Sequence, residues 1–409
     1  MKDSGVEWIG NIPKNWNIGR IGELYTERNQ KVSDIDFLPL SVTMQGILPQ
    51  LANVAKTDAH DDRKLVKKDD FVINSRSDRR GSCGIADRDG SVSLINTVLN
   101  PRNEMNPQYY SWLFHSSMFA DEFYKWGHGI VDDLWTTRWA DMKQIAVPCP
   151  SLIEQQQIAS FLDSKCSAID DVVTKTQESI EEYKKLKQAV ITEAVTKGVR
   201  GKRPMKDSGI DWIEKIPSEW NIVKIKKVMY DVNQQSRAQE EQLSVTQDRG
   251  IIKSSEAKIA NPSLNTEGWK LVQPDDIVFN KYKAHSGVFF VSQFRGIVTF
   301  NYSVYRCYEN NYPAFLEYLY KSSGCISEFI KSMKGVGESI SPLYTKDLFQ
   351  IYISQPSYKE QREIADYLDK KCAAIDSLIE KKQQFIEELT AYKKSLIYEY
   401  VTGKKEVPA

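Results

Sequence analysis

Apolar residues recur at alternating steps of four and three positions through the segment from Glu154 to Lys197. This alternation is the heptad spacing of a helix that packs through one face, as in a coiled coil. The segment has 44 residues, so as a helix it would extend about 66 Å, longer than most globular helices. Eight of the ten positions in the seam are apolar, and the seam consists of Leu162, Cys166, Ile169, Val173, Thr176, Ile180, Tyr183, Lys187, Val190 and Ala194.

The same seam returns 206 residues later, with its two polar interruptions at the same two places. Such a long helix needs a partner for its apolar face, and the nearest partner is the other copy. We therefore predict that the two helices pair antiparallel; the alternative is that each helix packs only on its own globular domain. The second seam consists of Leu368, Cys372, Ile375, Ile379, Lys382, Ile386, Leu389, Lys393, Leu396 and Tyr400.

The seams belong to an internal repeat of the whole chain. Met1 to Leu24 and Met205 to Val228 are identical at 13 of 24 positions, at an offset of 204 residues. Pro150 to Asp170 (PSLIEQQQIASFLDSKCSAID) returns as Pro356 to Asp376 (PSYKEQREIADYLDKKCAAID), at an offset of 206. Between these blocks the similarity is faint, so each half has matching ends and a divergent middle.

The divergent middles predict a mixture of strands and helices. Two amphipathic segments, Asn106 to Trp126 and Tyr312 to Met333, predict helices. β-Branched and aromatic runs predict strands at Phe71 to Asn74, Val92 to Leu99, Ile277 to Phe279, Gly287 to Val291, Ile297 to Tyr305 and Ile351 to Ile353.

Strands and helices alternate without a regular βαβ order, which favours the α+β class. The predicted fold is therefore two duplicated α+β domains separated by two long helices that form an antiparallel coiled coil. We place the first domain at 1–150, the central helix at 151–204, the second domain at 205–356 and the C-terminal helix at 357–409.

Composition restricts the possible partners. Lys and Arg together number 55, as do Asp and Glu, so a nucleic-acid site would have to be a local basic patch. The stretch 1–150 has 18 basic and 20 acidic residues, and 205–356 has 18 and 17. No apolar run is long enough to span a membrane and the start lacks a signal-peptide layout, so we expect a cytoplasmic protein. Six cysteines without a CxxC pair indicate reduced thiols and no metal site.

Catalytic motifs are missing from the sequence. It has no G-x-x-x-x-G-K-[ST] loop, no HExxH, no GxSxG and no G-x-G-x-x-G after a strand, and only four histidines. Asp275-Asp276 could suggest a nuclease carboxylate cluster, but the matching Asp69-Asp70 favours a turn that begins a strand. We therefore expect no enzymatic activity from this chain.

Two unlike polar loops occupy one position of the repeat. Asn74 to Arg80 (NSRSDRR) and Asn280 to Ser286 (NKYKAHS) each follow a predicted strand, and Thr43 to Gly46 and Thr246 to Gly250 form a second matched pair. A single loop of this kind would be interpreted as solvated surface, but a matched pair favours binding to a polyanion, with cations on phosphates and Arg or Gln on base edges. The candidate DNA-binding residues are Gln45, Arg76, Arg79, Arg80, Gln247, Arg249, Lys281, Tyr282, Lys283 and His285.

The repeated starts WIGNIPKNW and WIEKIPSEW, the repeated P-x-x-x-E-Q-x-x-I-A-x-x-L-D blocks and the heptad helices resemble the specificity subunit of a type I restriction-modification enzyme. The resemblance covers nearly the whole chain. Its second motif is carried by Pro150, Glu154, Gln155, Ile158, Ala159, Leu162 and Asp163, and again by Pro356, Glu360, Gln361, Ile364, Ala365, Leu368 and Asp369.

This resemblance implies that the two α+β domains are target recognition domains, one for each part of an asymmetric bipartite DNA site. It also implies that the helices set the distance between the domains and hold the partner subunits. The expected partners are double-stranded DNA, two methyltransferase subunits that methylate adenine, and restriction/translocase subunits that cleave DNA. S-adenosylmethionine, ATP and Mg are expected in those subunits, with no cofactor in this chain and no membrane partner.

Two other functions fit parts of the sequence. A non-catalytic coiled-coil scaffold could hold two binding modules that are not specific for DNA. Binding to DNA would distinguish a specificity subunit from such a scaffold. A self-contained methyltransferase would have to bind S-adenosylmethionine, and the sequence lacks a Gly-rich loop for it.

Overall fold

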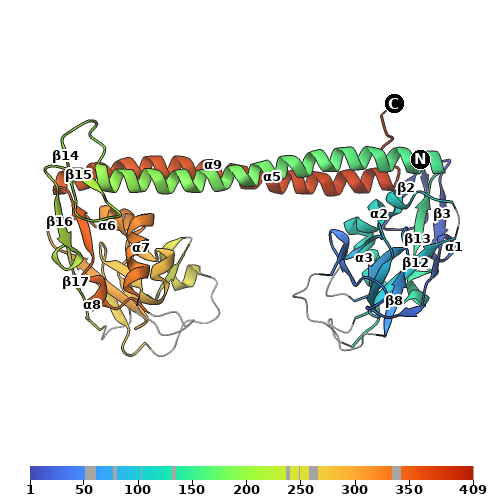
Figure 1. The fold of residues 1–409 in the computed structure, drawn as a ribbon, viewed down its shortest axis with the longest axis horizontal. Coiled ribbons are helices and arrows are strands. Elements are labelled where there is room, and N and C mark those ends of the chain that lie inside the picture. Colours follow the sequence, from blue (N-terminus) through green and yellow to red (C-terminus); the bar gives the residue numbers. More distant parts are fainter. Residues whose placement is uncertain are drawn as a thin grey trace. The chain divides into compact units, whose positions relative to one another are not determined.

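The computed structural model describes residues 1–50, 61–76, 81–102, 104–130, 135–235, 240–247, 249–257, 266–333 and 342–408. The chain forms two compact units: unit 1 combines Met1–Gln177 with Gln383–Ala409, and unit 2 is Glu178–Lys382. The two long helices, α5 (Leu152–Lys197) and α9 (Tyr358–Val401), each contribute to both units. Figure 1 shows the helices and strands along the chain.

Unit 1 contains a four-stranded antiparallel sheet in the order β10-β9-β12-β4, from β10 (Cys83–Ile85), β9 (Phe71–Asn74), β12 (Asn96–Pro101) and β4 (Tyr25–Glu27). A second sheet joins β11 (Gly90–Ser93), β8 (Arg63–Val66) and β5 (Lys31–Val32). The remaining antiparallel pairs are β6 (Leu40–Thr43) with β7 (Gly46–Pro49), β1 (Lys2–Asp3) with β2 (Asn11–Ile12), and β3 (Asn17–Arg20) with β13 (Ala146–Cys149).

Unit 2 repeats most of this topology, although its second sheet joins two strands where that of unit 1 joins three. Its four-stranded sheet has the order β17-β24-β21-β22, from β17 (Met229–Asp231), β24 (Tyr302–Cys307), β21 (Ile277–Asn280) and β22 (Phe289–Val291). The other pairs are β18 (Leu243–Thr246) with β19 (Gly250–Lys253), β20 (Lys270–Val272) with β23 (Gly296–Val298), β14 (Met205–Asp207) with β15 (Lys215–Pro217), and β16 (Asn221–Lys224) with β25 (Tyr352–Gln355).

Each predicted amphipathic helix is two helices in the structure. Ser116 separates α2 (Pro107–His115) from α3 (Ser117–Lys125), and Ser322 separates α6 (Pro313–Tyr320) from α7 (Ser323–Ser332). Both serines have extended backbone. The hydroxyl of each accepts a hydrogen bond from the backbone N–H three residues later in the chain, as an N-cap does. Short helices complete the elements: α1 (Ile21–Leu24), α4 (Trp139–Met142), α8 (Thr345–Leu348), η3 (Ile225–Lys227), η4 (Ser254–Glu256) and η5 (Lys281–Ser286).

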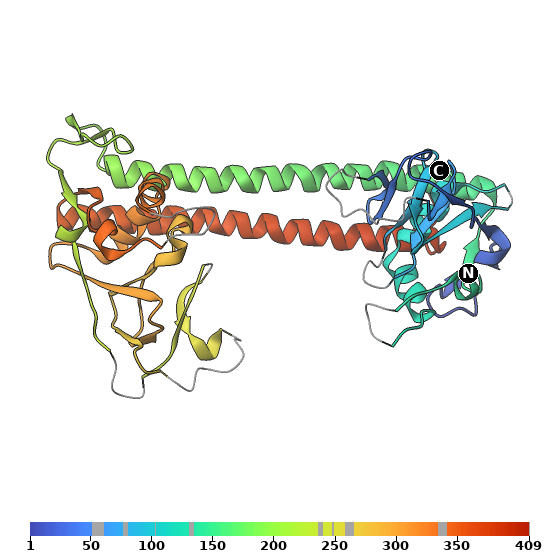
Figure 2. The same ribbon diagram turned by 60° about the horizontal axis from the view of Figure 1, so that its bottom comes forward.

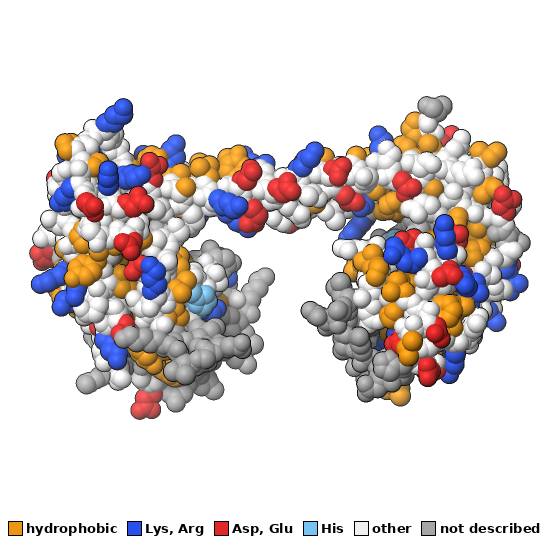
Figure 3. All heavy atoms as spheres, viewed as in Figure 1, with side chains coloured by type: hydrophobic (Ala, Val, Ile, Leu, Met, Phe, Trp, Pro, Cys, Tyr) orange, Lys and Arg blue, Asp and Glu red, His pale blue; other side chains and the backbone are white. Residues whose placement is uncertain are grey.

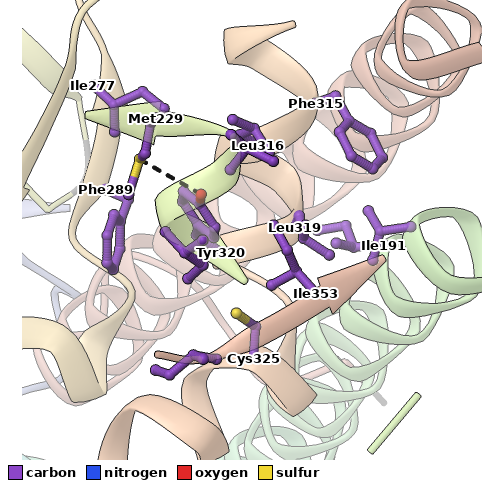
Figure 4. Packing of buried hydrophobic residues seen from close by; sticks show 14 of the residues in the cluster. Ile191, Met229, Ile277, Phe289, Phe315, Leu316, Leu319, Tyr320, Cys325 and Ile353 are labelled. Atoms are coloured by element: carbon purple, nitrogen blue, oxygen red, sulfur yellow. Dashed lines mark hydrogen bonds between the residues drawn. The ribbon is translucent and has the colours of Figure 1, made fainter. Parts of the chain in front are cut away.

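The core of each unit includes side chains from both the globular part and a long helix. In unit 2, Ile191 of α5 belongs to the same buried cluster as Phe315 and Leu319 of α6. Figure 4 shows this packing, in which the Tyr320 hydroxyl donates a 3.5 Å hydrogen bond to Met229 Sδ. In unit 1, the end of α9 takes that place, because Leu396, Ile397, Tyr400 and Val401 join the buried cluster.

Within each unit the segments of α5 and α9 lie side by side and run antiparallel (Figures 1 and 2). In unit 1 the Phe161 and Tyr400 rings are 4.5 Å apart, and further along Lys393 Nζ lies 2.6 Å from the Asp170 carboxylate. In unit 2 the repeat forms the equivalent ion pair, Lys187 with Asp376, also at 2.6 Å. All twenty predicted seam positions are buried or partly buried. The predicted fold class and antiparallel pairing are confirmed.

The repeated P-x-x-x-E-Q block joins each globular part to the start of a long helix. In unit 1, Glu154 accepts a hydrogen bond from Trp16 Nε1 at 3.0 Å. Gln155 Oε1 accepts the N–H of Asn106 at 2.8 Å, and Gln155 Nε2 donates to the carbonyl oxygen of Pro150 at 2.9 Å. These bonds explain why both residue types recur as a pair at this position.

Unit 2 makes the same bonds. Glu360 accepts from Trp220 Nε1 at 3.0 Å, and Gln361 accepts the N–H of Tyr312 at 2.7 Å.

Among the described residues, no helix is both long and apolar enough to cross a membrane.

Candidate nucleic-acid interface

The strand that leads into each basic loop begins at a fixed turn. Asp69 and Asp275 both have a φ of 70°, and the next residue, Asp70 or Asp276, is almost fully buried. Asp70 accepts a hydrogen bond from the N–H of Lys67 at 2.8 Å. Asp276 accepts one from the N–H of Gln273, the equivalent residue of its turn, at the same distance. This geometry confirms that the paired carboxylates form a strand-initiating turn rather than an open acidic cluster.

Each buried aspartate is paired with an arginine, but the arginine follows β4 in unit 1 and lies within β24 in unit 2. Arg28 Nε lies 2.7 Å from Asp70, whereas Asp276 pairs at 2.7 Å with Arg306 of β24, the position that Asn100 holds in β12. The hydrogen bond to Asp276 raises the pKa of the Arg306 guanidinium. Since both arginines neutralise a buried charge, they serve the fold and are not free to bind a ligand.

The basic loops leave β9 and β21 in the same manner. Asn74 Oδ1 accepts the N–H of Arg76 at 2.9 Å, and Asn280 Oδ1 accepts the N–H of Tyr282 at 3.1 Å. These side-chain bonds fix the start of each loop, and the Arg76 side chain is exposed. The predicted residues Arg79 and Arg80 lie outside the described residues.

In unit 2 the loop is the short helix η5. Lys281 Nζ lies 5.4 Å from the centroid of the Tyr282 ring, and Tyr282 is 44% exposed. Lys283 and His285 are also exposed. The loop therefore presents two cations, an aromatic face and an imidazole to solvent, a combination that suits phosphate and base contacts.

The second pair of predicted loops packs against the strands that follow the first pair. Gln45 is exposed on the β6–β7 hairpin, and a Cβ added to Gly84 of β10 would lie only 2.9 Å from the Cα of Gly46. In unit 2, a Cβ added to the hairpin glycine Gly250 would lie 3.1 Å from the ring of Phe290 of β22. The structure thus brings each hairpin against the strand that leaves the basic loop. In the hairpin of unit 2, Gln247 and Arg249 are exposed.

Unit 1 has a polar groove that the sequence analysis missed. Arg76, Arg138 and Lys143 line it, and all three side chains are exposed. The groove has a volume of about 550 Å³, and its Glu27 carboxylate pairs with Lys64 at 3.4 Å. Little in the sequence points to Arg138 and Lys143. Between them, only Asp141 is identical to its counterpart in the other half, Asp347.

In unit 2 the position of Arg138 is held by Tyr344, which is 51% exposed. The N–H of Leu343 donates to the carbonyl oxygen of Lys281 at 2.9 Å, which places Tyr344 next to η5. The two units therefore present different chemistry at one topological position: cations in unit 1, and cations with aromatic rings in unit 2.

Opposite charges alternate over the described residues on the surface that Figure 3 shows, and these residues form no continuous basic field on that face of either unit. Several cations are paired, for example Lys67 with Asp89 and Arg295 with Glu240, both at 2.7 Å. The six cysteines form no disulfide, and the described part of the chain contains no group of three or more His, Cys, Asp or Glu that could hold a metal.

The chain is similar in sequence to a type I restriction enzyme specificity subunit, MjaVIII, of Methanocaldococcus jannaschii. The two are 24% identical, and the match covers 97% of this chain and 94% of the relative. No family model matches the sequence.

Solved structures of type I restriction-modification systems share the fold. A chain from a structure that addresses complex assembly and conformational transition of a type I system has a TM-score of 0.72 at 16% identity, covering 97% of this chain and 100% of the other. The HsdS subunit of Thermoanaerobacter tengcongensis has a TM-score of 0.53 at 16% identity, covering 99% and 100%.

Proposed function

We propose that this chain, which is similar to type I restriction enzyme specificity subunits along nearly its whole length, is the non-catalytic DNA-recognition subunit of such a complex. Its domains at 1–150 and 205–356 each recognise one part of an asymmetric bipartite site, and the helices within 151–204 and 357–409 connect them. One observation carries this proposal: the repeat keeps one backbone arrangement while presenting unlike polar side chains at the same position.

In unit 1 the DNA contacts are proposed for the groove of Arg76, Arg138 and Lys143 and for Gln45 on the β6–β7 hairpin. Arg79 and Arg80 stay candidates from the sequence. Because a guanidinium can bind guanine bidentately, Arg76 and Arg138 suit base contacts, whereas Lys143 suits a phosphate.

In unit 2 the proposed contacts are Lys281, Tyr282, Lys283 and His285 of η5, with Gln247 and Arg249 of the hairpin. Tyr344 joins them, since it lies next to η5 and is half exposed. Aromatic faces stack on bases or pack against sugars, which gives this unit a less salt-dependent share of binding than unit 1.

The proposed partners are double-stranded DNA, two methyltransferase subunits and restriction/translocase subunits. The methyltransferase subunits bind the exposed faces of the helices and methylate adenine, and all partner subunits together supply the sites for S-adenosylmethionine, ATP and Mg. With a net charge of zero, this chain alone binds DNA weakly, and the partners contribute the missing cationic surface.

The test is DNA footprinting of the assembled complex at physiological salt. Replacing Lys281 and Lys283 by Ala should reduce protection of one half-site only, and replacing Arg138 and Lys143 the other. Loss of a phosphate contact should also lower the salt slope by about one per lysine. A matched control replaces Lys226 and Lys227, two exposed lysines of η3, and should leave the footprint unchanged.

Two results would contradict the proposal. If either double substitution removed protection from both halves, the units would not recognise separate half-sites. If the complex bound no DNA sequence preferentially, the chain would instead be a scaffold for other binding modules.

A further inference from the structure

In unit 2, an arginine side chain packs into the joint between the globular part and the start of the long helix. Arg203 pairs with the Glu360 carboxylate, and its guanidinium lies 5.2 Å from the centroid of the Trp220 ring. It also donates to the carbonyl oxygen of Lys197 at 2.9 Å and pairs with Glu219 at 2.9 Å. Only 10% of the Arg203 side chain is exposed, so the guanidinium is a built-in part of the joint.

Among the described residues, the joint of unit 1 has the same carboxylate and the same indole but no arginine. Gly198 and Gly403 follow the two long helices with φ values of 75° and 69°, and the stretches after them reach Pro204 and Pro408. The residue before each proline is Arg203 in unit 2 and Val407 in unit 1. The stretch is one residue shorter in unit 1, and the residue that it places near Glu154 is the apolar Val407 rather than a cation.

The structure leaves a cavity of about 230 Å³ at this place in unit 1. Trp16, Glu154, Gln157, Glu406 and Val407 are among the residues that line it. Glu154 accepts hydrogen bonds from Trp16, Asn15 and Ser151, all neutral donors.

The cavity is acidic. Within the described residues neither Glu154 nor Glu406 is paired with a cation, and the one lysine of the lining, Lys405, lies 2.8 Å from Glu399 instead.

We propose that this cavity of unit 1 binds a guanidinium group, supplied by an arginine side chain of a partner protein, in the place that Arg203 fills in unit 2. The same Glu and Trp pair already binds a guanidinium in the other half of the molecule, which is the direct precedent. Arginine suits the site better than lysine because its planar fork matches a carboxylate and is weakly hydrated, so it enters a partly buried cavity at lower cost.

The test uses the full chain labelled with ¹⁵N at its nine tryptophans. The indole signal of Trp16 reports on the cavity because its N–H is bonded to Glu154, and the signal of Trp220 is an internal control because its joint is already filled. N-acetyl-arginine-methylamide should shift the Trp16 signal saturably and leave Trp220 in place. The corresponding lysine compound should bind about tenfold more weakly.

Two variants keep the test decisive. Glu154→Gln retains an acceptor for Trp16 but removes the charge, and should weaken binding about tenfold. Val407→Arg should fill the cavity from within, move the Trp16 signal toward that of Trp220 and abolish the response to the probe.

The proposal is overturned if Trp16 shows no saturable shift, if Trp220 shifts equally, or if Val407→Arg responds as the wild type does. Free arginine that binds much more tightly than the blocked compound would overturn the assignment to a protein partner. None of these outcomes depends on whether the chain recognises DNA.

Discussion

The indole N–H of Trp16 donates a hydrogen bond of 3.0 Å to the carboxylate of Glu154, 138 residues further along the chain. Trp220 and Glu360 repeat this bond at the same distance. The two sequence blocks that the halves share, at the start of each domain and the start of each helix, are thus the two sides of one joint. This structural role by itself accounts for their similarity.

The two joints should differ in their contribution to stability. Glu360→Gln leaves the buried guanidinium of Arg203 with only the exposed Glu219 as a charge partner, and should lower the free energy of unfolding by about 2 kcal/mol. Glu154→Gln, at a partly exposed site with neutral donors, should lower it by only about 1 kcal/mol. Hydrogen exchange of the amides in β14–β15 and β1–β2 would measure the two effects separately, and equal losses would contradict the assignment.

The buried aspartates predict that one substitution can restore the stability lost through another. Arg28→Val leaves Asp70, which is 1% exposed, without a counter-charge and should destabilise unit 1 by about 3 kcal/mol. Adding Asn100→Arg would recreate the arrangement of unit 2, where Arg306 pairs with Asp276, and should restore most of the loss. Urea unfolding followed by tryptophan fluorescence checks this, with Asn100→Arg alone as the control. A double variant no more stable than Arg28→Val would show that the two arrangements are not interchangeable.

The helix seam predicts that the stability lost through a charged substitution depends on which face of the helix carries it. Ile180 lies in the seam and is 5% exposed, so Ile180→Asp places an unpaired charge in an apolar contact and should cost about 3 kcal/mol or more. Val172, on the same helix but outside the seam, is 42% exposed, and Val172→Asp should change stability by less than about 0.5 kcal/mol. Thermal unfolding of both variants is the measurement. Similar losses from both would place the packed face elsewhere.

Burial of the seam predicts a pH effect. Loss of solvent raises the pKa of the Cys166 thiol from its ordinary value of 9.0 to about 11. Between these values the unfolded chain releases the proton while the folded chain retains it, so this contribution to stability is complete below pH 9 and disappears as the pH rises toward 11. The unfolding temperature of wild type should therefore fall more steeply from pH 9 to 11 than that of Cys166→Ala. Parallel curves would show that the thiol is not protected.

The sequence by itself determined the elements whose pattern is local. The four-and-three alternation from Leu162 to Ala194 predicts a buried stripe, because helical geometry alone brings such positions onto one face, and the structure buries or partly buries every one of them. The repeat likewise predicts that both halves share one topology. A strand such as Phe71–Asn74 follows from its own run of apolar residues.

The tertiary structure decided what depends on contacts between distant segments. The break at Ser116 interrupts an otherwise helical pattern, and the side chains of Phe114 before it and Phe119 after it lie in the same buried cluster. Arg76 and Arg138 are 62 positions apart, and only the fold places them in one groove. No spacing rule connects residues so far apart, because their distance depends on the packing of every element between them.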